Sequence, residues 1–400
     1  MPLPVLYERI SRDALVEIAK SRTLSSPELL KLKSSTFDPL IWLLGIACGK
    51  NEFNKQVATR IMYNLLRRLD EDEDADSKKI STEQKIWCLE RDVYTIGEVA
   101  RLNQNADIDH IMNGNDLRAV TKMVSEAASD IYAKVFVEHF GRGEPLREFN
   151  SLDRNGKEAI DYCVKSMGSG MATFLRKGRP EKIGQTRDYC FQVAGVIGSR
   201  FFNRLIHNYD KDNAGNPITL DDTDAEHFGE FLQLINITKN VRLDYGEGRV
   251  FFPAELRPEG VSHEELMDDL GAAEARNNVF SSMTQIIQND RDRTLDYLTS
   301  IPSQLSGFKA FCFSSYVTGI KTLEQMINSG AERVFAGDKA AITLQGGEES
   351  VYGIMNMSYD LTRNGKKTNE FLERFTSNPQ NYNFEQKNYI KWSQEWLKAT

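Results

Sequence analysis

The sequence is poor in cysteine, and its cysteines are far apart. Cys48, Cys88, Cys163, Cys190 and Cys312 form no CxxC pair and no Cys/His pair with zinc spacing. This excludes a disulfide-rich secreted scaffold and a structural zinc site, and it predicts reduced core cysteines. Long apolar runs are missing too: no window approaches the ~18 apolar residues of a membrane span, and acidic and basic residues interrupt the N-terminus where a signal peptide needs an apolar run. We expect a cytoplasmic protein without a membrane anchor.

An excess of positive charge is also absent. The 400 residues include 50 Lys and Arg against 58 Asp and Glu, which gives a net charge of −8. Nucleic-acid binding depends on clustered Lys and Arg that displace phosphate counterions. We therefore expect no nucleic-acid partner.

Proline is scarce, with 11 in the chain and none between Pro39 and Pro145 or between Pro302 and Pro379. In these stretches apolar residues recur at spacings of three and four, which is typical of amphipathic helices. Alternating strand patterns are weak, and no repeat appears at the periods of helical solenoids. The sequence predicts an all-α fold with one main domain at residues 31–365, an N-terminal helical extension at 1–30 and a polar C-terminal tail or helix at 366–400.

One helical segment carries an acidic stripe. Tyr63, Arg67, Asp70 and Asp74 follow one another at helical spacing, and Glu73 lies beside them. Carboxylates one turn apart repel each other, so a solvated helix end explains such a run more often than a metal site does. In the alternative interpretation Asp70 and Asp74 bind Mg²⁺, which prefers carboxylate oxygen and keeps coordination positions open for a substrate phosphate.

A second segment carries a narrow polar stripe on an otherwise apolar helix. Its members are Gln233, Asn236, Asn240 and Asp244, spaced by three, four and four residues. Amides and one carboxylate, in place of Lys and Glu, are expected where a helix lines an internal cavity, although a buried amide network between helices remains an alternative. These oxygens could also bind Mg²⁺. Three nearby cations could hold a diphosphate: Lys239, Arg242 and Arg249.

The run 301–320 contains Lys309 as its only charged residue. A lone ammonium in an apolar helix is costly unless it reaches water or an anion, so Lys309 either extends to the surface or points into a cavity and meets a phosphate. Leu305 would then shape the apolar part of that cavity together with Phe308 and Phe311. Two metal-binding stripes, several cations and an apolar interior suit a prenyl diphosphate.

Five segments, at 65–74, 161–175, 188–205, 229–253 and 307–312, resemble the squalene and phytoene synthase family in order and spacing. The resemblance implies a single all-α isoprenoid synthase domain in which two Asp-rich helices face each other and bind Mg²⁺-diphosphate. It also assigns roles residue by residue: Asp70, Glu73 and Asp74 to the first Asp-rich motif, Arg67 to its arginine, Tyr189 to the catalytic-site tyrosine, and Gln233 and Asn236 to the second helix.

The sequence departs from the family at several places, including Ser35 and Ser315-Tyr316, and three departures bear on the reaction. Lys239-Asn240 replaces an Arg-Asp pair, Lys309 replaces an apolar residue, and the basic segment that serves the nicotinamide cofactor of squalene synthases is missing before Ala341. We therefore expect no NADPH requirement. In these respects the chain is similar to squalene-synthase-like fungal proteins that cyclise farnesyl diphosphate to humulene.

The leading hypothesis is a class I sesquiterpene cyclase that forms a humulene-type macrocycle from farnesyl diphosphate by Mg²⁺-assisted ionisation, 1,11-closure and deprotonation. Alternatives are a squalene synthase-type head-to-head condensation of two farnesyl diphosphates and a non-catalytic scaffold of the same fold. The expected Mg²⁺ ligands are Asp70, Asp74, Asn236, Asn240 and Asp244. The expected diphosphate contacts are Lys309, Lys239, Arg67 and Arg249, and the expected catalytic residues are Lys309, Arg67 and Tyr189. The expected pocket residues are Leu305, Phe308, Phe311, Gln233 and Tyr63.

Overall fold

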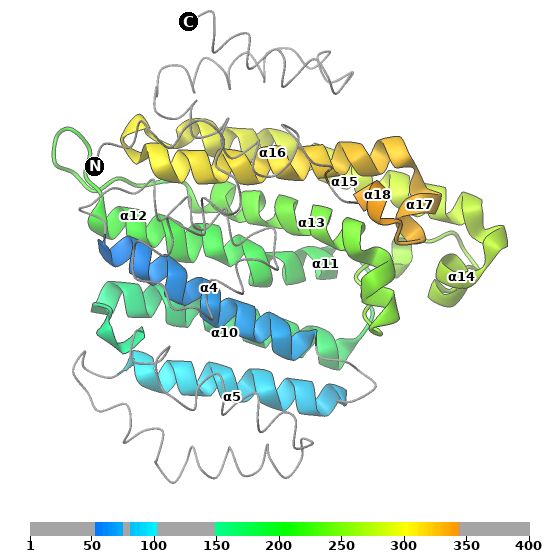
Figure 1. Ribbon diagram of the computed structural model, residues 1–400, viewed down its shortest axis with the longest axis horizontal. Coiled ribbons are helices and arrows are strands. Elements are labelled where there is room, and N and C mark those ends of the chain that lie inside the picture. Colours follow the sequence, from blue (N-terminus) through cyan, green and yellow to red (C-terminus); the bar gives the residue numbers. More distant parts are fainter. Residues whose placement is uncertain (1–52, 75–80, 102–148, 343, 345–400) are drawn as a thin grey trace, which may run out of the picture. The chain divides into compact units, whose positions relative to one another are not determined.

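The computed structural model describes residues 53–74, 81–101, 149–342 and 344 (Figure 1). All regular elements in these ranges are helical, and the only strand-like feature there is an isolated bridge between Lys211 and Pro217. The predicted all-α fold is confirmed. The expected domain boundaries at residues 30 and 365 lie outside the described residues and stay predictions.

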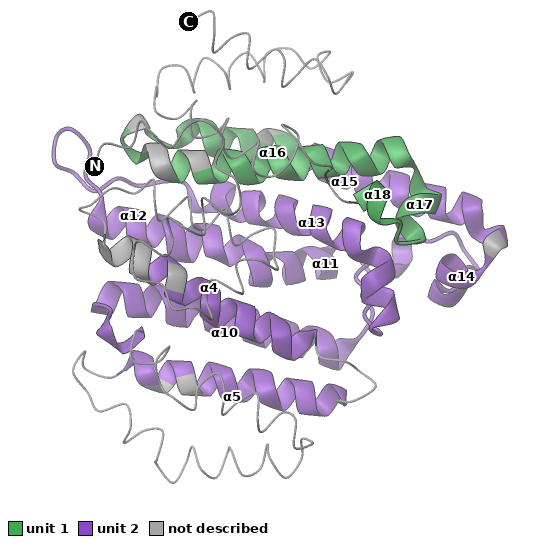
Figure 2. Ribbon diagram, in the orientation of Figure 1, with its two compact units in different colours: residues 1–51, 291–400 green, residues 52–290 purple. Residues whose placement is uncertain are grey.

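The described helices fall into two compact units, residues 52–290 and residues 1–51 with 291–400 (Figure 2). The division falls within α15 (Ala273–Ser300). The larger unit contains α4 (Phe53–Glu73), α5 (Thr82–Ala100), α10 (Arg154–Lys177), α11 (Ile183–Cys190), α12 (Asn203–Tyr209), α13 (Asp222–Gly246) and α14 (His263–Asp268). The smaller unit contains α16 (Ser306–Ser329), α17 (Ala331–Phe335) and α18 (Lys339–Ile342).

Helices α4, α5 and α10 pack side by side in the larger unit (Figure 1). Between α4 and α5 lies a fully buried ionic group, in which Arg68 Nη2 lies 2.9 Å from Asp72 Oδ1 and Arg91 Nη2 lies 2.6 Å from Asp92 Oδ1. Arg68 Nε also lies 3.3 Å from Asp92 Oδ2, which joins the two pairs. Because unpaired buried charges are strongly disfavoured, this group fixes how α4 packs against α5.

The backbone makes an unusually close crossing where α13 meets the segment after α11. Residues Phe191–Gly195 and Ile197–Phe202 are π-helical turns, which are frequent at functional sites. A Cβ on Gly229 would lie 2.5 Å from the Ala194 carbonyl oxygen, and a Cβ on Gly198 would lie 2.5 Å from that of Ala225. Glycine at both positions therefore lets the two backbones touch, which fixes the end of α11 relative to α13.

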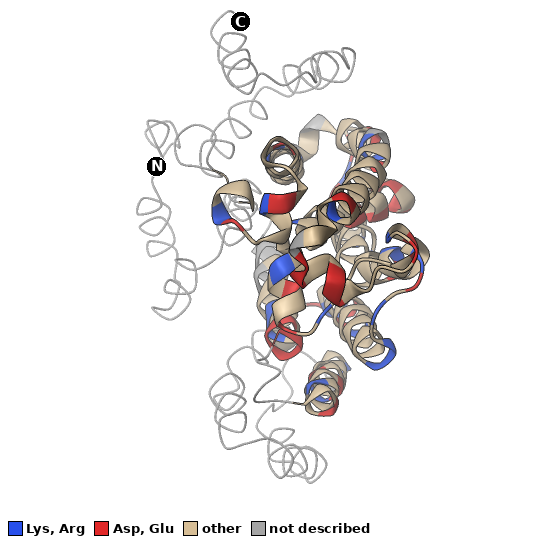
Figure 3. Cartoon of the chain, turned by 90° about the vertical axis from the view of Figure 1, so that its right-hand side faces the viewer, with Lys and Arg blue, Asp and Glu red and all other residues tan. Residues whose placement is uncertain are grey.

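The cysteines, the apolar character of the helices and the charge distribution can be described for the same ranges. Cys88, Cys163, Cys190 and Cys312 are buried and unpaired, as expected of reduced core cysteines. Within the described ranges, no helix has the length and apolar character needed to cross a membrane. Figure 3 shows Lys and Arg interspersed with Asp and Glu along the helices.

Candidate functional site

The acidic run at the end of α4 is divided between two faces of the helix. Asp72 is fully buried against α5, whereas 37% of the Asp70 side chain and 51% of the Asp74 side chain remain exposed. Glu73 is buried. Desolvation by the surrounding protein, followed by repulsion from Asp74, raises the pKa of Asp70 to about 7, even though its side chain is partly accessible. The run is therefore not one solvated helix end.

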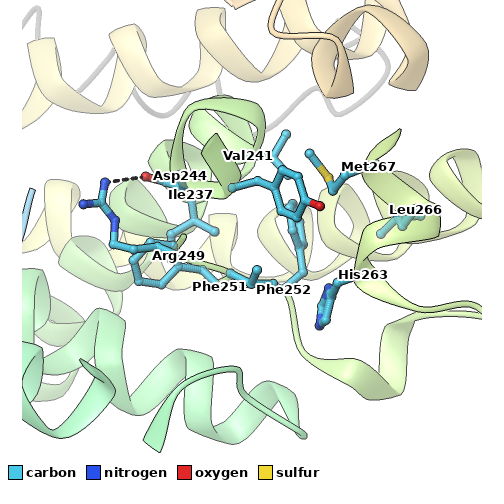
Figure 4. A pocket seen from close by; sticks show the side chains of 11 residues that line it. Ile237, Val241, Asp244, Arg249, Phe251, Phe252, His263, Leu266 and Met267 are labelled. Atoms are coloured by element: carbon cyan, nitrogen blue, oxygen red, sulfur yellow. Dashed lines mark hydrogen bonds and ion pairs between the residues drawn. The ribbon is translucent and has the colours of Figure 1, made fainter. Parts of the chain in front are cut away.

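Arg249, in the loop after α13, connects the two Asp-bearing helices. Its Nη1 lies 2.8 Å from Asp74 Oδ1, and its Nη2 lies 2.9 Å from Asp244 Oδ1 (Figure 4). Nη2 also lies 2.5 Å from Glu247 Oε2. Burial lowers the pKa of Arg249, but the carboxylates outweigh this effect and raise the pKa overall. The side chain is 7% exposed, so this cation is held between acids of α4 and α13.

The same arginine helps to satisfy the C-terminus of α4. Lys85 Nζ donates to the Glu73 carbonyl oxygen at 3.0 Å, and Arg249 Nη1 donates to it at 3.4 Å. The last carbonyls of a helix have no intrahelical partners and form the negative end of its dipole, so two cations there are favourable. This contact places the acidic end of α4 beside the loop after α13.

The Glu73 side chain pairs with Tyr189 at the end of α11. The tyrosine hydroxyl donates to Glu73 Oε2 at 2.8 Å, and both residues are buried. Desolvation raises the pKa of Glu73 to about 8, and it also raises the pKa of Tyr189 well above its ordinary value. The Tyr189 ring packs against Phe174 and Phe251, with ring centroids 4.9 and 4.8 Å away. The predicted catalytic tyrosine thus lies against the first Asp-rich motif.

The polar stripe of α13 is present as a continuous row. Gln233, Asn236 and Asn240 are half-buried, and Asn240 Nδ2 donates to Asn236 Oδ1 at 3.2 Å. At the end of the row Asp244 is 8% exposed, and desolvation raises its pKa to about 6 against the lowering effect of Arg249. Lys239 is half-buried, and its pKa is lowered by desolvation.

Three further residues predicted from the sequence also belong to the larger unit. Arg67 Nη1 is 3.6 Å from Asp70 Oδ2, with 48% of its side chain exposed, so it can turn toward an anion. Tyr63, one turn before Arg67 on α4, is half-buried. Arg242 is engaged elsewhere, because it donates to the Met267 carbonyl and to Asp268 Oδ1, both at 2.9 Å, and so anchors α14.

The donor set suits Mg²⁺ in chemical type. Carboxylates of Asp70, Asp74 and Asp244 and the amides of Asn236 and Asn240 supply the oxygen atoms that this hard cation prefers. In the described part of the chain, however, no three His, Cys, Asp or Glu side chains lie close enough together to hold a metal as they stand. One oxygen of Asp74 and one of Asp244 are instead taken by Arg249. The second oxygen of each carboxylate is not bound by Arg249, so Arg249 and a metal would share these two acids.

The remaining predicted residues belong to the smaller unit. Lys309 is 1% exposed in α16, and its Nζ donates to the Ile301 carbonyl oxygen at 2.8 Å, so it does not extend to the surface. Desolvation lowers its pKa to about 8. Phe308 and Phe311 are buried in the same helix, and buried Leu305 immediately precedes it.

Sequence reasoning missed several residues of the larger-unit site. Lys85 binds the α4 terminus from a segment without a recognisable motif, and Glu247, which contacts Arg249, lies within the segment 229–253 but was given no role. Phe174 and Phe251 stack with centroids 4.5 Å apart, although 77 positions separate them in the sequence (251 − 174). Only the tertiary fold brings these residues together.

Comparison with known proteins decides the family. The squalene/phytoene synthase model matches residues 61–345, which include α13 and most of α4. The chain belongs to the squalene/phytoene synthase family. It is thus one of a family of isoprenoid synthases, and the resemblance noted in the sequence motifs is confirmed.

Similar members of the family are named as squalene synthases. Squalene synthase BSS of Botryococcus braunii is 27% identical over 72% of this chain and 56% of its own length. The squalene synthase of Mycosarcoma maydis is 30% identical over 46% of this chain and 35% of its own length. The matched region thus spans about half or less of these relatives.

Solved structures show the same fold. A complex of TcSQS with the ligand E5700 has a TM-score of 0.55 at 20% identity, and covers 91% of this chain and 95% of that one. A second TcSQS complex, with BPH1237, has a TM-score of 0.53 at 18% identity, and covers 90% of this chain and 96% of that one. Both have the isoprenoid synthase fold that the motifs predicted.

Proposed function

We propose that the residues around Arg249 form a site that ionises a prenyl diphosphate, with farnesyl diphosphate as the substrate. The observation that carries this proposal is that one buried guanidinium lies within 3 Å of carboxylates on both Asp-bearing helices. A site that brings such acids and cations together can bind a metal-complexed diphosphate.

The position of each residue in the site indicates its role. Asp70 on α4 and Asp74 directly after it, with Asn236, Asn240 and Asp244 on α13, would hold Mg²⁺. When bound there, Mg²⁺ supplies positive charge that stabilises a diphosphate as a leaving group. Arg249 and Arg67 would donate to the diphosphate oxygens.

Tyr189 and Glu73 provide a buried proton-bearing pair beside the first motif. Because the hydroxyl donates to the carboxylate, the pair can hold a proton at Glu73 or at Tyr189 without exposure to water. This arrangement supports a role for Tyr189 next to the reacting carbon chain, where a cation develops.

The farnesyl cation formed by ionisation can react in two ways, and a different observation favours each. The names of the relatives favour transfer to a second farnesyl diphosphate, as in squalene synthesis. The half-buried Lys239-Asn240 pair on α13, in place of the family's Arg-Asp, favours the second candidate, an intramolecular cyclisation to a humulene-type sesquiterpene. In either case Lys309 is a candidate diphosphate contact, because it is a buried ammonium in an apolar helix.

The test is incubation of purified protein with farnesyl diphosphate and Mg²⁺, with and without NADPH, followed by mass analysis of the hydrocarbon extract. A thirty-carbon product supports condensation, and a cyclic fifteen-carbon hydrocarbon that forms without NADPH supports cyclisation. Asp74→Asn should abolish either product, whereas Arg204→Gln, at an exposed ion pair with Glu158, should leave it unchanged. Intact substrate with the folded wild-type protein would overturn the proposal.

A further inference from the structure

A buried lysine at the start of α5 faces the end of the helix that carries the first Asp-rich motif. Lys85 lies in the first turn of α5 and is only 2% exposed. A capping box fixes this turn, because the Ser81 amide donates to Gln84 Oε1 at 2.9 Å and the Gln84 amide donates to Ser81 Oγ at 3.2 Å. The backbone of Lys85 is therefore held in place independently of its side chain.

This position is unfavourable for a lysine unless a negative group compensates. The N-terminus of a helix carries partial positive charge, and burial removes water from the ammonium. Desolvation is the main cause that lowers the pKa of Lys85, and the carboxylates of Glu73 and Asp74 act against it. The hydrogen-bond partner is the carbonyl of Glu73, the last residue of α4, which accepts from Lys85 Nζ at 3.0 Å. The negative end of α4 thus stabilises a cation that the start of α5 disfavours.

The Glu73 carbonyl belongs to the turn that carries two of the acids expected to bind Mg²⁺. The Asp74 amide donates to the Asp70 carbonyl at 2.8 Å, so the last helical turn runs on to Asp74. Residues four apart share one face of a helix, so Asp70 and Asp74 point the same way only while this turn stays wound. Helix ends fray unless their carbonyls find partners outside the helix. Lys85 supplies the shorter of the two bonds to this carbonyl, because Arg249 Nη1 lies at 3.4 Å.

Helix α5 also holds the opposite side of α4. Asp72 is two residues from both Asp70 and Asp74, which at about 3.6 residues per turn places it roughly 200° around the helix from each. It lies 3.7 Å from Arg91 Nη2 of α5, within the buried ionic group. Contacts from α5 therefore set the rotation of α4 through the ionic group and hold its end through Lys85.

We propose that Lys85 is a positioning residue for Mg²⁺ binding. Its hydrogen bond to the Glu73 carbonyl keeps the last turn of α4 wound and so presents Asp70 and Asp74 together. The inference rests on the proposed function, in which these two acids hold the ion. Lys85 acts through the main chain of α4 and not as a ligand.

The sign of the effect separates this role from a simple charge effect. A cation near a metal site repels the metal, so removal of the Lys85 charge alone would strengthen metal binding. Loss of a positioning contact weakens metal binding instead. The two explanations therefore predict opposite changes for Lys85→Met, which removes the ammonium and keeps an unbranched side chain of similar size.

The test measures Mn²⁺ binding to the full chain from the electron paramagnetic resonance signal of the free ion. Mn²⁺ shares the preference of Mg²⁺ for carboxylate oxygen. We expect saturable binding in wild type and an affinity about tenfold lower in Lys85→Met, as for loss of one charge-assisted hydrogen bond. Lys85→Arg keeps the charge and the donors, so it should bind Mn²⁺ nearly as tightly as wild type does.

A second measurement follows the helix end without any metal. Hydrogen exchange of the peptide that contains Asp74, detected by mass spectrometry, should be faster in Lys85→Met than in wild type, because the last turn of α4 opens more often. If Lys85→Met does not fold, Lys85→Gln replaces it in both measurements. Its amide is uncharged and one atom shorter, so it holds the Glu73 carbonyl less closely.

Lys157→Met is the matched control. Lys157 is also a buried lysine in the first turn of a helix, and its Nζ donates to Asn150 Oδ1 at 2.6 Å. Desolvation lowers its pKa, as it does for Lys85. Its replacement removes a buried ammonium from the start of α10 instead of α5, so the Mn²⁺ affinity and the exchange at the end of α4 should both stay unchanged.

Two results would overturn the proposal: a Mn²⁺ affinity in Lys85→Met equal to or above that of wild type, or unchanged hydrogen exchange at the end of α4. Absence of Mn²⁺ binding to the wild-type protein would remove the metal site on which both the proposed function and this inference depend. The failure of the inference alone is thus distinguishable from the failure of the proposed function.

Discussion

Arg249 allows a stringent test of the site, because it holds two acidic helices together. In Arg249→Gln, Asp244 loses its 2.9 Å partner while staying buried, and the Glu73 carbonyl loses one of its two donors. Breaking a buried pair from one side costs about 3–5 kcal/mol. Asp74 is half exposed and regains water, so we expect the lower end, about 3 kcal/mol at neutral pH.

The pH dependence of this loss follows from Asp244. The pKa of the Asp244 carboxyl is about 6 in the folded protein and 3.8 in the unfolded chain. The folded state therefore binds the carboxyl proton more tightly than the unfolded chain does. As the pH rises past 3.8, loss of this proton lowers the stability of the folded state. Without Arg249 the folded pKa rises further, and that cost grows. The destabilisation by Arg249→Gln should therefore be largest near about pH 8 and shrink near about pH 5, where the carboxyl is protonated.

Urea unfolding followed by circular dichroism measures both the loss of stability in Arg249→Gln and its dependence on pH. Asp244→Asn in the Arg249→Gln background should recover part of the lost stability, because no buried charge is then left unpaired. Arg204→Gln, which breaks an exposed pair with Glu158, should cost under about 1 kcal/mol. Equal losses at both pH values, or no recovery in the double variant, would refute the reasoning.

Three other substitutions test separate parts of the structure. Tyr189→Phe should cost about 1–3 kcal/mol by leaving buried Glu73 without its hydroxyl donor, and should slow turnover; unchanged urea unfolding would argue against that hydrogen bond. Gly229→Ala places a Cβ 2.5 Å from the Ala194 carbonyl oxygen and should cost about 1–3 kcal/mol, as overpacking does; a wild-type unfolding midpoint would show that the crossing can relax. Lys309→Met removes a buried ammonium whose pKa is lowered to about 8, so stability should change by less than about 1.5 kcal/mol, yet turnover should stop; a fully active variant would remove this lysine from the mechanism.

The helical periodicity of the sequence was enough to predict which polar side chains share one face of α13. The spacing of Asn236 and Asn240 predicted one continuous stripe, and the two side chains are indeed hydrogen-bonded on α13. Tyr189 was assigned through the family resemblance, and it lies against the first motif. Local spacing works here because a helix determines the relative directions of its own side chains.

Contacts between elements could not be predicted in the same way. Arg249 was expected to contact a diphosphate, but its link between α4 and α13 depends on the path of a loop. Lys309 donates to the carbonyl of Ile301, eight residues earlier, because the chain turns between α15 and α16. Leu305 lies at that turn with φ −94° and ψ 38°, so helical spacing does not place it relative to Lys309.

The close crossing at Gly198 and Gly229 has a consequence for protein engineering. There the main chains of the two segments pack directly against each other, so we expect this contact, more than the side chains along the rest of α13, to set their alignment. Pocket residues such as Gln233 can therefore be exchanged in libraries that search for new products without shifting the helix that carries them. Variants at the two glycines, in contrast, would alter the scaffold itself.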